Sequence, residues 1–150
     1  MNLEEKKDAY CGLYCGSCPA FLKTQKAVKE GKTDFSDDST ACLGCKSEVV
    51  SEWCRICDMK SCAKGKGYDS CAECADYQCE RIRSFVHDPD WLYHIETPWY
   101  IQSIRKYGKE QWIREMSVRW SCPNCGEIQD WYSKECSKCK MPQRGYEKIK

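Results

Sequence analysis

The chain contains 150 residues, of which 15 are cysteines, and its 24 basic and 23 acidic side chains give a formal net charge of +1. This balance excludes the uniformly basic surface that drives nonspecific binding to nucleic acids. No apolar run near the N-terminus resembles a signal peptide and none is long enough to span a membrane, so we expect a cytoplasmic protein with reduced thiols and no membrane partner.

The cysteines indicate metal sites rather than disulfides. Their number is odd, so they cannot all pair within the chain, and most stand in Cys-x-x-Cys pairs, the spacing of metal-binding knuckles. They form two groups separated by a stretch without cysteine. We therefore predict a small metal-stabilised α+β protein with a multi-knuckle cysteine-rich domain at residues 1–87, a helical connector at 88–119 and a zinc-ribbon or rubredoxin-like module at 120–150.

The first knuckle contains Cys11, Cys15 and Cys18. Their Cys-x3-Cys-x2-Cys spacing is the one with which radical S-adenosylmethionine enzymes hold a four-iron cluster. The chain is too short for the barrel of such an enzyme and lacks its alternation of strands and helices, so this assignment is not favoured.

A helix is predicted directly after this knuckle. Pro19 suits a first helical position, the following residues are good helix formers, and Gly31 suits the end of a helix that spans 19–30. The polar run 32–40 is predicted to be a loop that leads into the second knuckle, Cys42-Leu43-Gly44-Cys45.

An internal echo follows, in which Cys54-x-x-Cys57-x4-Cys62 is repeated as Cys71-x-x-Cys74-x4-Cys79. For zinc, the natural grouping joins Cys15 and Cys18 to Cys42 and Cys45, and joins the two echo units to each other. Because eleven cysteines do not divide by four, we also expect bystander thiols, a binuclear site with bridging sulfur, or a histidine ligand, His87 or His94.

The sequence Trp53-Cys54-Arg55-Ile56-Cys57 resembles the Trp-Cys-x-x-Cys of thioredoxin-like oxidoreductases. A thioredoxin motif lies between a buried strand and a long helix, whereas here the preceding segment is short and Cys62 follows closely. A redox enzyme that uses Cys54 and Cys57 is therefore kept only as a third hypothesis.

The connector is predicted to contain two helices. Thr97 and Pro98 suit the N-cap and first position of one helix, which Gly108 ends. Trp112 and Met116 lie on one side of the second. The connector also mixes aromatic residues with basic ones that suit contact with a nucleic acid or a protein, although inward aromatic residues and solvated charges explain the mixture better. The basic residues are Arg105, Lys106, Lys109, Arg114 and Arg119.

The C-terminal cysteines give the strongest local signal. Cys122-Pro123-Asn124-Cys125 and Cys136-Ser137-Lys138-Cys139 form a pair of knuckles whose four thiolates suit tetrahedral zinc. A complete shell of four cysteines leaves no open position for substrate, so we expect a structural ion. Iron in the same ligand set would give a one-electron carrier.

The layout of the knuckles resembles the family catalogued as domain of unknown function 3795. The resemblance covers approximately residues 8–87 and includes Cys11-Gly12-Leu13-Tyr14-Cys15-Gly16-Ser17-Cys18-Pro19, Cys42-Leu43-Gly44-Cys45 and Cys71-Ala72-Glu73-Cys74. It implies zinc binding in a prokaryotic protein and no established activity. Cys54 fits the family pattern least, and Lys140 stands where many ribbons have glycine.

These observations favour a zinc-binding structural or adaptor protein with two or three zinc ions. Its expected partner is a macromolecule, a protein rather than a nucleic acid. The alternative is an electron-transfer or redox-sensing protein with an iron–sulfur cluster in the N-terminal domain. No catalytic residue is proposed, since neither a nucleophile with a base nor a paired set of carboxylates stands out. The candidate metal ligands are Cys122, Cys125, Cys136, Cys139, Cys11, Cys15, Cys18, Cys42, Cys45, Cys57, Cys62, Cys71, Cys74 and Cys79, with Cys54 as a further possibility.

Overall fold

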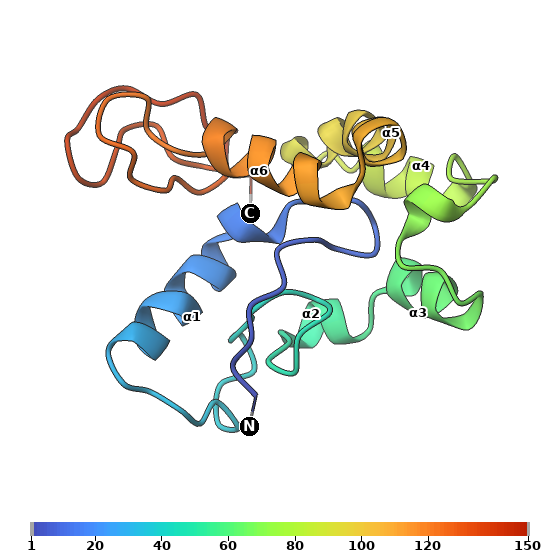
Figure 1. Cartoon of the computed structure of the whole chain (residues 1–150), viewed down its shortest axis with the longest axis horizontal. Coiled ribbons are helices and arrows are strands. Elements are labelled where there is room, and N and C mark those ends of the chain that lie inside the picture. The colour runs from blue at the N-terminus through green and yellow to red at the C-terminus, as the bar shows by residue number, and fades with distance from the viewer. Residues whose placement is uncertain (1, 150) are drawn as a thin grey trace.

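The computed structural model describes residues 2–149, which are mostly helical (Figure 1). The elements, with η for 3-10 helices, are η1 (Cys15–Ser17), α1 (Pro19–Lys29), α2 (Glu52–Arg55), α3 (Asp58–Gly65), η2 (Cys71–Glu73), α4 (Glu80–Val86), η3 (Leu92–Glu96), α5 (Thr97–Tyr107) and α6 (Lys109–Arg119). None of the helices in this part of the chain has the length and apolarity needed to cross a membrane.

The α+β class expected from the sequence is not supported, because residues 2–149 contain no strand. Extended segments meet only at the isolated antiparallel bridges Asp8↔Tyr14, Ser121↔Ile128 and Glu135↔Pro142. The last two lie where the strands of a zinc ribbon were expected. The segments around each bridge exchange short-range hydrogen bonds, such as those from Cys122 to Glu127 and from Gln129 to Trp120 at 2.8 and 2.7 Å, but the pairing is too short to be a strand.

Helix α1 confirms the helix predicted over 19–30. Pro19 occupies its first turn, and Phe21 and Thr24 are buried on one face. The helix ends at Lys29, with Gly31 in the left-handed region at φ 100°. Glycine adopts this conformation without the steric cost that a Cβ atom brings.

Helices α5 and α6 confirm the predicted connector, with one correction. Thr97 is not the N-cap of α5, because η3 runs directly into the helix and leaves Thr97 in helical geometry with a buried hydroxyl that has no partner among the described residues. Gly108 separates the two helices at φ 89°. Trp112 of α6 is fully buried and contacts the rings of Tyr14 and Tyr100 at centroid distances of 6.0 and 5.7 Å.

Three helices were not predicted from the sequence: α2, α3 and α4. The last two begin immediately after cysteines, since Cys57 and Cys79 are their N-cap residues, and each has an acidic residue, Asp58 or Glu80, in its first turn. An acidic side chain there interacts favourably with the helix dipole. These acidic residues were the sequence feature that could have indicated α3 and α4. The cysteine spacing by itself does not predict a helix.

The main core joins all three parts of the predicted domain division. It contains Tyr14 near the N-terminus, Ile101 and Trp112 of the connector, and Trp131 of the C-terminal loops. A smaller core around Phe35 and Leu43 lies beside α1. Figure 1 shows the N-terminal segment running between α1 and α2 and then looping beneath α5 and α6.

Replacing Gly44 by alanine is expected to destabilise the protein by at least about 3 kcal/mol. Gly44 has φ 108°, and a Cβ atom there would lie 1.8 Å from the backbone oxygen of Lys6. Urea denaturation measures the loss. Gly31→Ala is the matched control: its φ is 100° but nothing lies within 4 Å, so we expect a loss of only about 1–2 kcal/mol. Equal losses in the two variants would contradict the collision with Lys6.

Candidate metal centres

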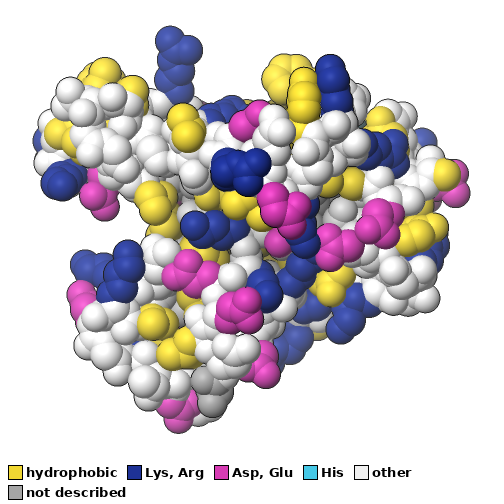
Figure 2. Space-filling view, viewed as in Figure 1, with side chains coloured by type: hydrophobic (Ala, Val, Ile, Leu, Met, Phe, Trp, Pro, Cys, Tyr) yellow, Lys and Arg dark blue, Asp and Glu magenta, His cyan; other side chains and the backbone are white. Residues whose placement is uncertain are grey.

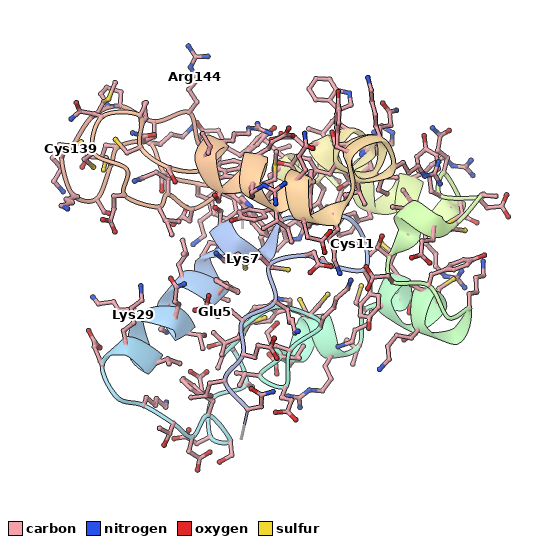
Figure 3. The ribbon with its side chains drawn as sticks, in the orientation of Figure 1. Glu5, Lys7, Cys11, Lys29, Cys139 and Arg144 are labelled. Atoms are coloured by element: carbon pink, nitrogen blue, oxygen red, sulfur yellow. The ribbon has the colours of Figure 1, made fainter. Side chains whose placement is uncertain are left out.

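The C-terminal cysteines form a compact four-sulfur site. The Sγ atoms of Cys122, Cys125, Cys136 and Cys139 all lie within 4.8 Å of one another. Cys122 and Cys139 are 3.6 Å apart, and Cys125 and Cys136 are 3.5 Å apart. Tetrahedral zinc with Zn–S bonds of about 2.3 Å places its sulfurs about 3.8 Å apart. The four residues therefore form a site that can hold a metal ion, and Figure 3 shows Cys139 in the C-terminal loops, away from Cys11.

Two equivalent turns build this site. The N–H of Gly126 donates to the carbonyl of Cys122, and that of Lys140 donates to Cys136, at 2.8 and 3.0 Å. Gly126 and Lys140 both have left-handed backbone, at φ 80° and 67°. Lys140 thus occupies a position that glycine suits better, as its place in the sequence indicated, and the site retains all four sulfurs.

Hydrogen bonds converge on Cys136 and favour its thiolate. The backbone N–H groups of Cys139 and Lys138 and the side-chain amide of Gln129 donate to its sulfur over 3.5, 3.4 and 3.3 Å. The backbone donors, led by Cys139, lower the pKa of Cys136 to about 6. Since metals bind the thiolate form, the lowered pKa favours metal binding by Cys136 at neutral pH. The contribution of Gln129 had no signal in the sequence.

A larger cavity, of about 560 Å³, gathers cysteines from the N-terminal part of the chain. The cysteines that line it are Cys11, Cys15, Cys18, Cys42, Cys45, Cys54 and Cys57. Cys15 and Cys18 thus line the same cavity as Cys42 and Cys45, with which the sequence pattern grouped them, but among the described residues these four sulfurs do not all lie within 4.8 Å of one another. Cys54, which was expected to be a thiol that binds no metal, also lines this cavity.

Within this cavity the sulfurs of Cys42 and Cys45 accept hydrogen bonds. The N–H groups of Gly44 and Tyr10 donate to them, each over 3.4 Å. A hydrogen bond from the Cys54 thiol is the main cause that lowers the pKa of Cys42 to about 6, and one from Cys15 lowers the pKa of Cys45. The second knuckle therefore supplies two sulfurs whose pKa is lowered, each by a hydrogen bond from a thiol of another segment.

Aromatic rings form another wall of the cavity. Tyr93 stacks on Trp131 at 3.9 Å and meets the ring of His94 edge-on at 4.5 Å. His94 in turn stacks on Phe85 at 3.8 Å, and its Nδ1 lies 3.1 Å from the Phe85 carbonyl oxygen. This wall was missed in the sequence, because its residues come from distant segments. His94 is packed among rings, as expected for a histidine without a partner nearby in sequence.

The stability of the protein is expected to fall as the pH is lowered from about 6.5 to 4. Burial lowers the pKa of His94 from 6.5 to about 4, so the unfolded chain takes up this proton first. The stabilisation is complete above pH 6.5 and is lost at up to about 1.4 kcal/mol per pH unit through the window. The stabilities of the wild type and of His94→Phe are measured by urea denaturation at pH 7 and at pH 5. Protonation of the thiolates affects both proteins, so the difference between their pH dependences gives the contribution of His94. His87→Gln, at an exposed histidine, should retain the wild-type difference between the two pH values, and a retained difference in His94→Phe would contradict the assignment.

The remaining cysteines lie elsewhere. Cys62, Cys71, Cys74 and Cys79 line a separate cavity of about 150 Å³. Cys62 of the first echo unit thus lies with all three cysteines of the second unit, whereas Cys54 and Cys57 line the larger cavity, and Cys57 and Cys79 also line a common pocket. Cys54 lies in the four-residue helix α2 and Cys57 is the N-cap residue of α3, with no strand before them in residues 2–149, which is unlike a thioredoxin motif.

Comparison with known proteins gives one finding. A model of the family described as "Protein of unknown function (DUF3795)" matches residues 7–84, more than half of the chain. The searches of curated proteins and of solved structures found no match. The matched region contains the seven cysteines of the larger cavity and the four remaining N-terminal cysteines, but it ends before the aromatic wall of that cavity and before the C-terminal site.

Proposed function

The chain belongs to the DUF3795 family, and from this premise we propose that it is a zinc-binding structural and adaptor protein of the prokaryotic cytoplasm. The observation that carries the proposal is the C-terminal site, where four cysteine sulfurs lie within 4.8 Å of one another. Four thiolates in this arrangement suit zinc, and zinc with four protein ligands has no open position for a substrate. When bound, the ion would cross-link loops that have no strand to hold them.

A protein partner is favoured over a nucleic acid because several basic residues of the connector are already engaged. Arg105 donates to the carbonyl oxygen of Ala72 at 2.6 Å, and Lys109 pairs with Asp69 at 3.1 Å. Arg119 pairs with buried Glu96. Figure 2 shows acidic and basic side chains intermixed over the visible face.

The proposed contact region is the start of α5. Ile95 and Trp99 lie four residues apart and are 55% and 72% exposed. Large exposed aromatic side chains are enriched where proteins bind one another. A photoreactive amino acid in place of Trp99 tests this, with the same group in place of exposed Lys23 on α1 as control. Adducts to protein that appear only at position 99 are expected, whereas adducts to nucleic acid would contradict the proposal.

Elemental analysis tests the metal. The full chain, purified without oxygen, is expected to contain zinc. Absence of zinc would overturn the proposal for the C-terminal site.

A second candidate function follows from the size of the seven-cysteine cavity. At about 560 Å³ it is much larger than one ion requires, which supports an iron–sulfur cluster and hence electron transfer or redox sensing. Iron together with acid-labile sulfide in the purified chain, lost on Cys18→Ser, would favour this candidate for the N-terminal domain.

A further inference from the structure

A third group of cysteines lies outside both sites described above. It consists of Cys62 in α3, Cys71 and Cys74 at the two ends of the η2 turn, and Cys79 before α4, and all four line one cavity of about 150 Å³. Three of them are half-buried and Cys71 is buried. Separate elements of the fold thus place four cysteine sulfurs, which are soft metal ligands, around one small cavity.

Charged and backbone contacts hold this group in place. Arg81 Nη1 donates a hydrogen bond to the sulfur of Cys62 over 3.8 Å. Arg105 reaches from α5 to donate to the carbonyl oxygens of Ala72 and Cys74, and its guanidinium lies 4.3 Å from the ring centre of Tyr77. A helix of the main core therefore fixes the η2 turn that presents Cys71 and Cys74.

The spacing of these sulfurs does not suit one ion. Among the described residues, only the C-terminal cysteines form a set of three or more ligand atoms within 4.8 Å of one another. Sulfurs around a single zinc ion stand about 3.8 Å apart. In an iron–sulfur cluster, irons and inorganic sulfides lie between the cysteines, so the cysteine sulfurs stand further apart. The cavity of about 150 Å³ exceeds several times the roughly 30 Å³ that one water molecule occupies in the liquid.

We infer that Cys62, Cys71, Cys74 and Cys79 form a separate centre that binds an iron–sulfur cluster. The inference goes beyond the proposed function, since it concerns neither the C-terminal zinc site nor the seven-cysteine cavity. The four cysteines complete the ligand set that such clusters use, and Arg81 and Arg105 supply positive charge near it.

The test uses the full chain produced and purified without oxygen, with iron and sulfide supplied. Native mass spectrometry of the unaltered chain should show a mass increment of iron plus inorganic sulfide. Cys74→Ser and Cys62→Ser, whose ligands come from different elements, should each lose the same iron and sulfide and keep the zinc content unchanged. Circular dichroism verifies that the helices persist, and the mass measurement on the unaltered chain stands even where a variant fails to fold.

Two control variants assign any loss to its site. Cys139→Ser should lose zinc alone, and Cys18→Ser should leave the iron of this centre in place. Iron that is lost in Cys18→Ser but kept in Cys74→Ser would belong to the larger cavity and overturn the inference. Zinc lost from Cys74→Ser would identify a zinc site instead, and a chain without iron would also overturn the inference.

Discussion

Cys136→Ser is expected to release one zinc ion per chain and to unfold the loops from about residue 121 to the C-terminus. Cys136 is fully buried, and its sulfur lies 3.5 Å from that of Cys125 and accepts three N–H groups. Structural zinc in small modules contributes apparent binding energies of about 10–16 kcal/mol, which exceeds what two isolated bridges can supply. Zinc analysis and amide hydrogen exchange measure the two effects.

Ser137→Ala is the matched control, because Ser137 stands next to the ligand in the same turn and coordinates nothing in the proposed site. It should keep the wild-type zinc content and exchange rates. A Cys136→Ser chain that still binds the full complement of zinc would contradict the C-terminal site. Loss of zinc without faster exchange in the loops would show that the ion does not hold them.

Glu96→Ala is expected to destabilise the whole protein by about 3 kcal/mol. The Glu96 carboxylate is 5% exposed and accepts from Arg119 of α6, Tyr100 of α5 and Tyr146 near the C-terminus. Removing it leaves three donors without their acceptor, and breaking a buried charged pair costs more than the pair contributes. Arg119 is 44% exposed and can recover water, which places the expected loss at the lower end of the range for such pairs.

Urea denaturation measures this loss, and Glu115→Ala on α6 is its control. Glu115 is exposed and accepts a hydrogen bond from Gln111 at 3.2 Å on the helix surface, so its removal should change stability by no more than about 0.5 kcal/mol. Faster amide exchange near Tyr146 in Glu96→Ala should accompany the loss. Equal stabilities of the two variants would contradict the role of Glu96 as a shared acceptor.

What the sequence revealed was mainly local. Pro19 and Gly31 fixed the ends of α1, and Gly108 separated α5 from α6. The unusual position of Lys140 was also visible, because the turn from Cys136 to Lys140 involves few residues. The ligand set of the C-terminal site lies within 18 consecutive residues, so its spacing was enough to predict a metal site.

What the sequence concealed depends on contacts between distant segments. The echo of Cys54-x-x-Cys57 in Cys71-x-x-Cys74 suggested one repeated unit, and in both pairs the N–H of the second cysteine donates to the carbonyl of the first, at 3.4 and 3.1 Å. The surroundings differ, because Cys57 is the N-cap residue of α3 whereas Cys74 ends η2 and precedes a loop. Arg105 of α5 holds the η2 turn through the carbonyl of Ala72, and the repeat gave no sign of this contact.

The aromatic wall of the seven-cysteine cavity has a consequence for synthesis. The cysteines lie between residues 11 and 57, but Trp131, which stacks on Tyr93, is made more than 70 residues later. At about 5–20 residues per second, the thiols leave the ribosome several seconds before this wall can close over them. During that interval the thiols are accessible to metal carriers and to oxidants. The period in which metal can reach them freely therefore ends when the segment that contains Trp131 packs against the cavity.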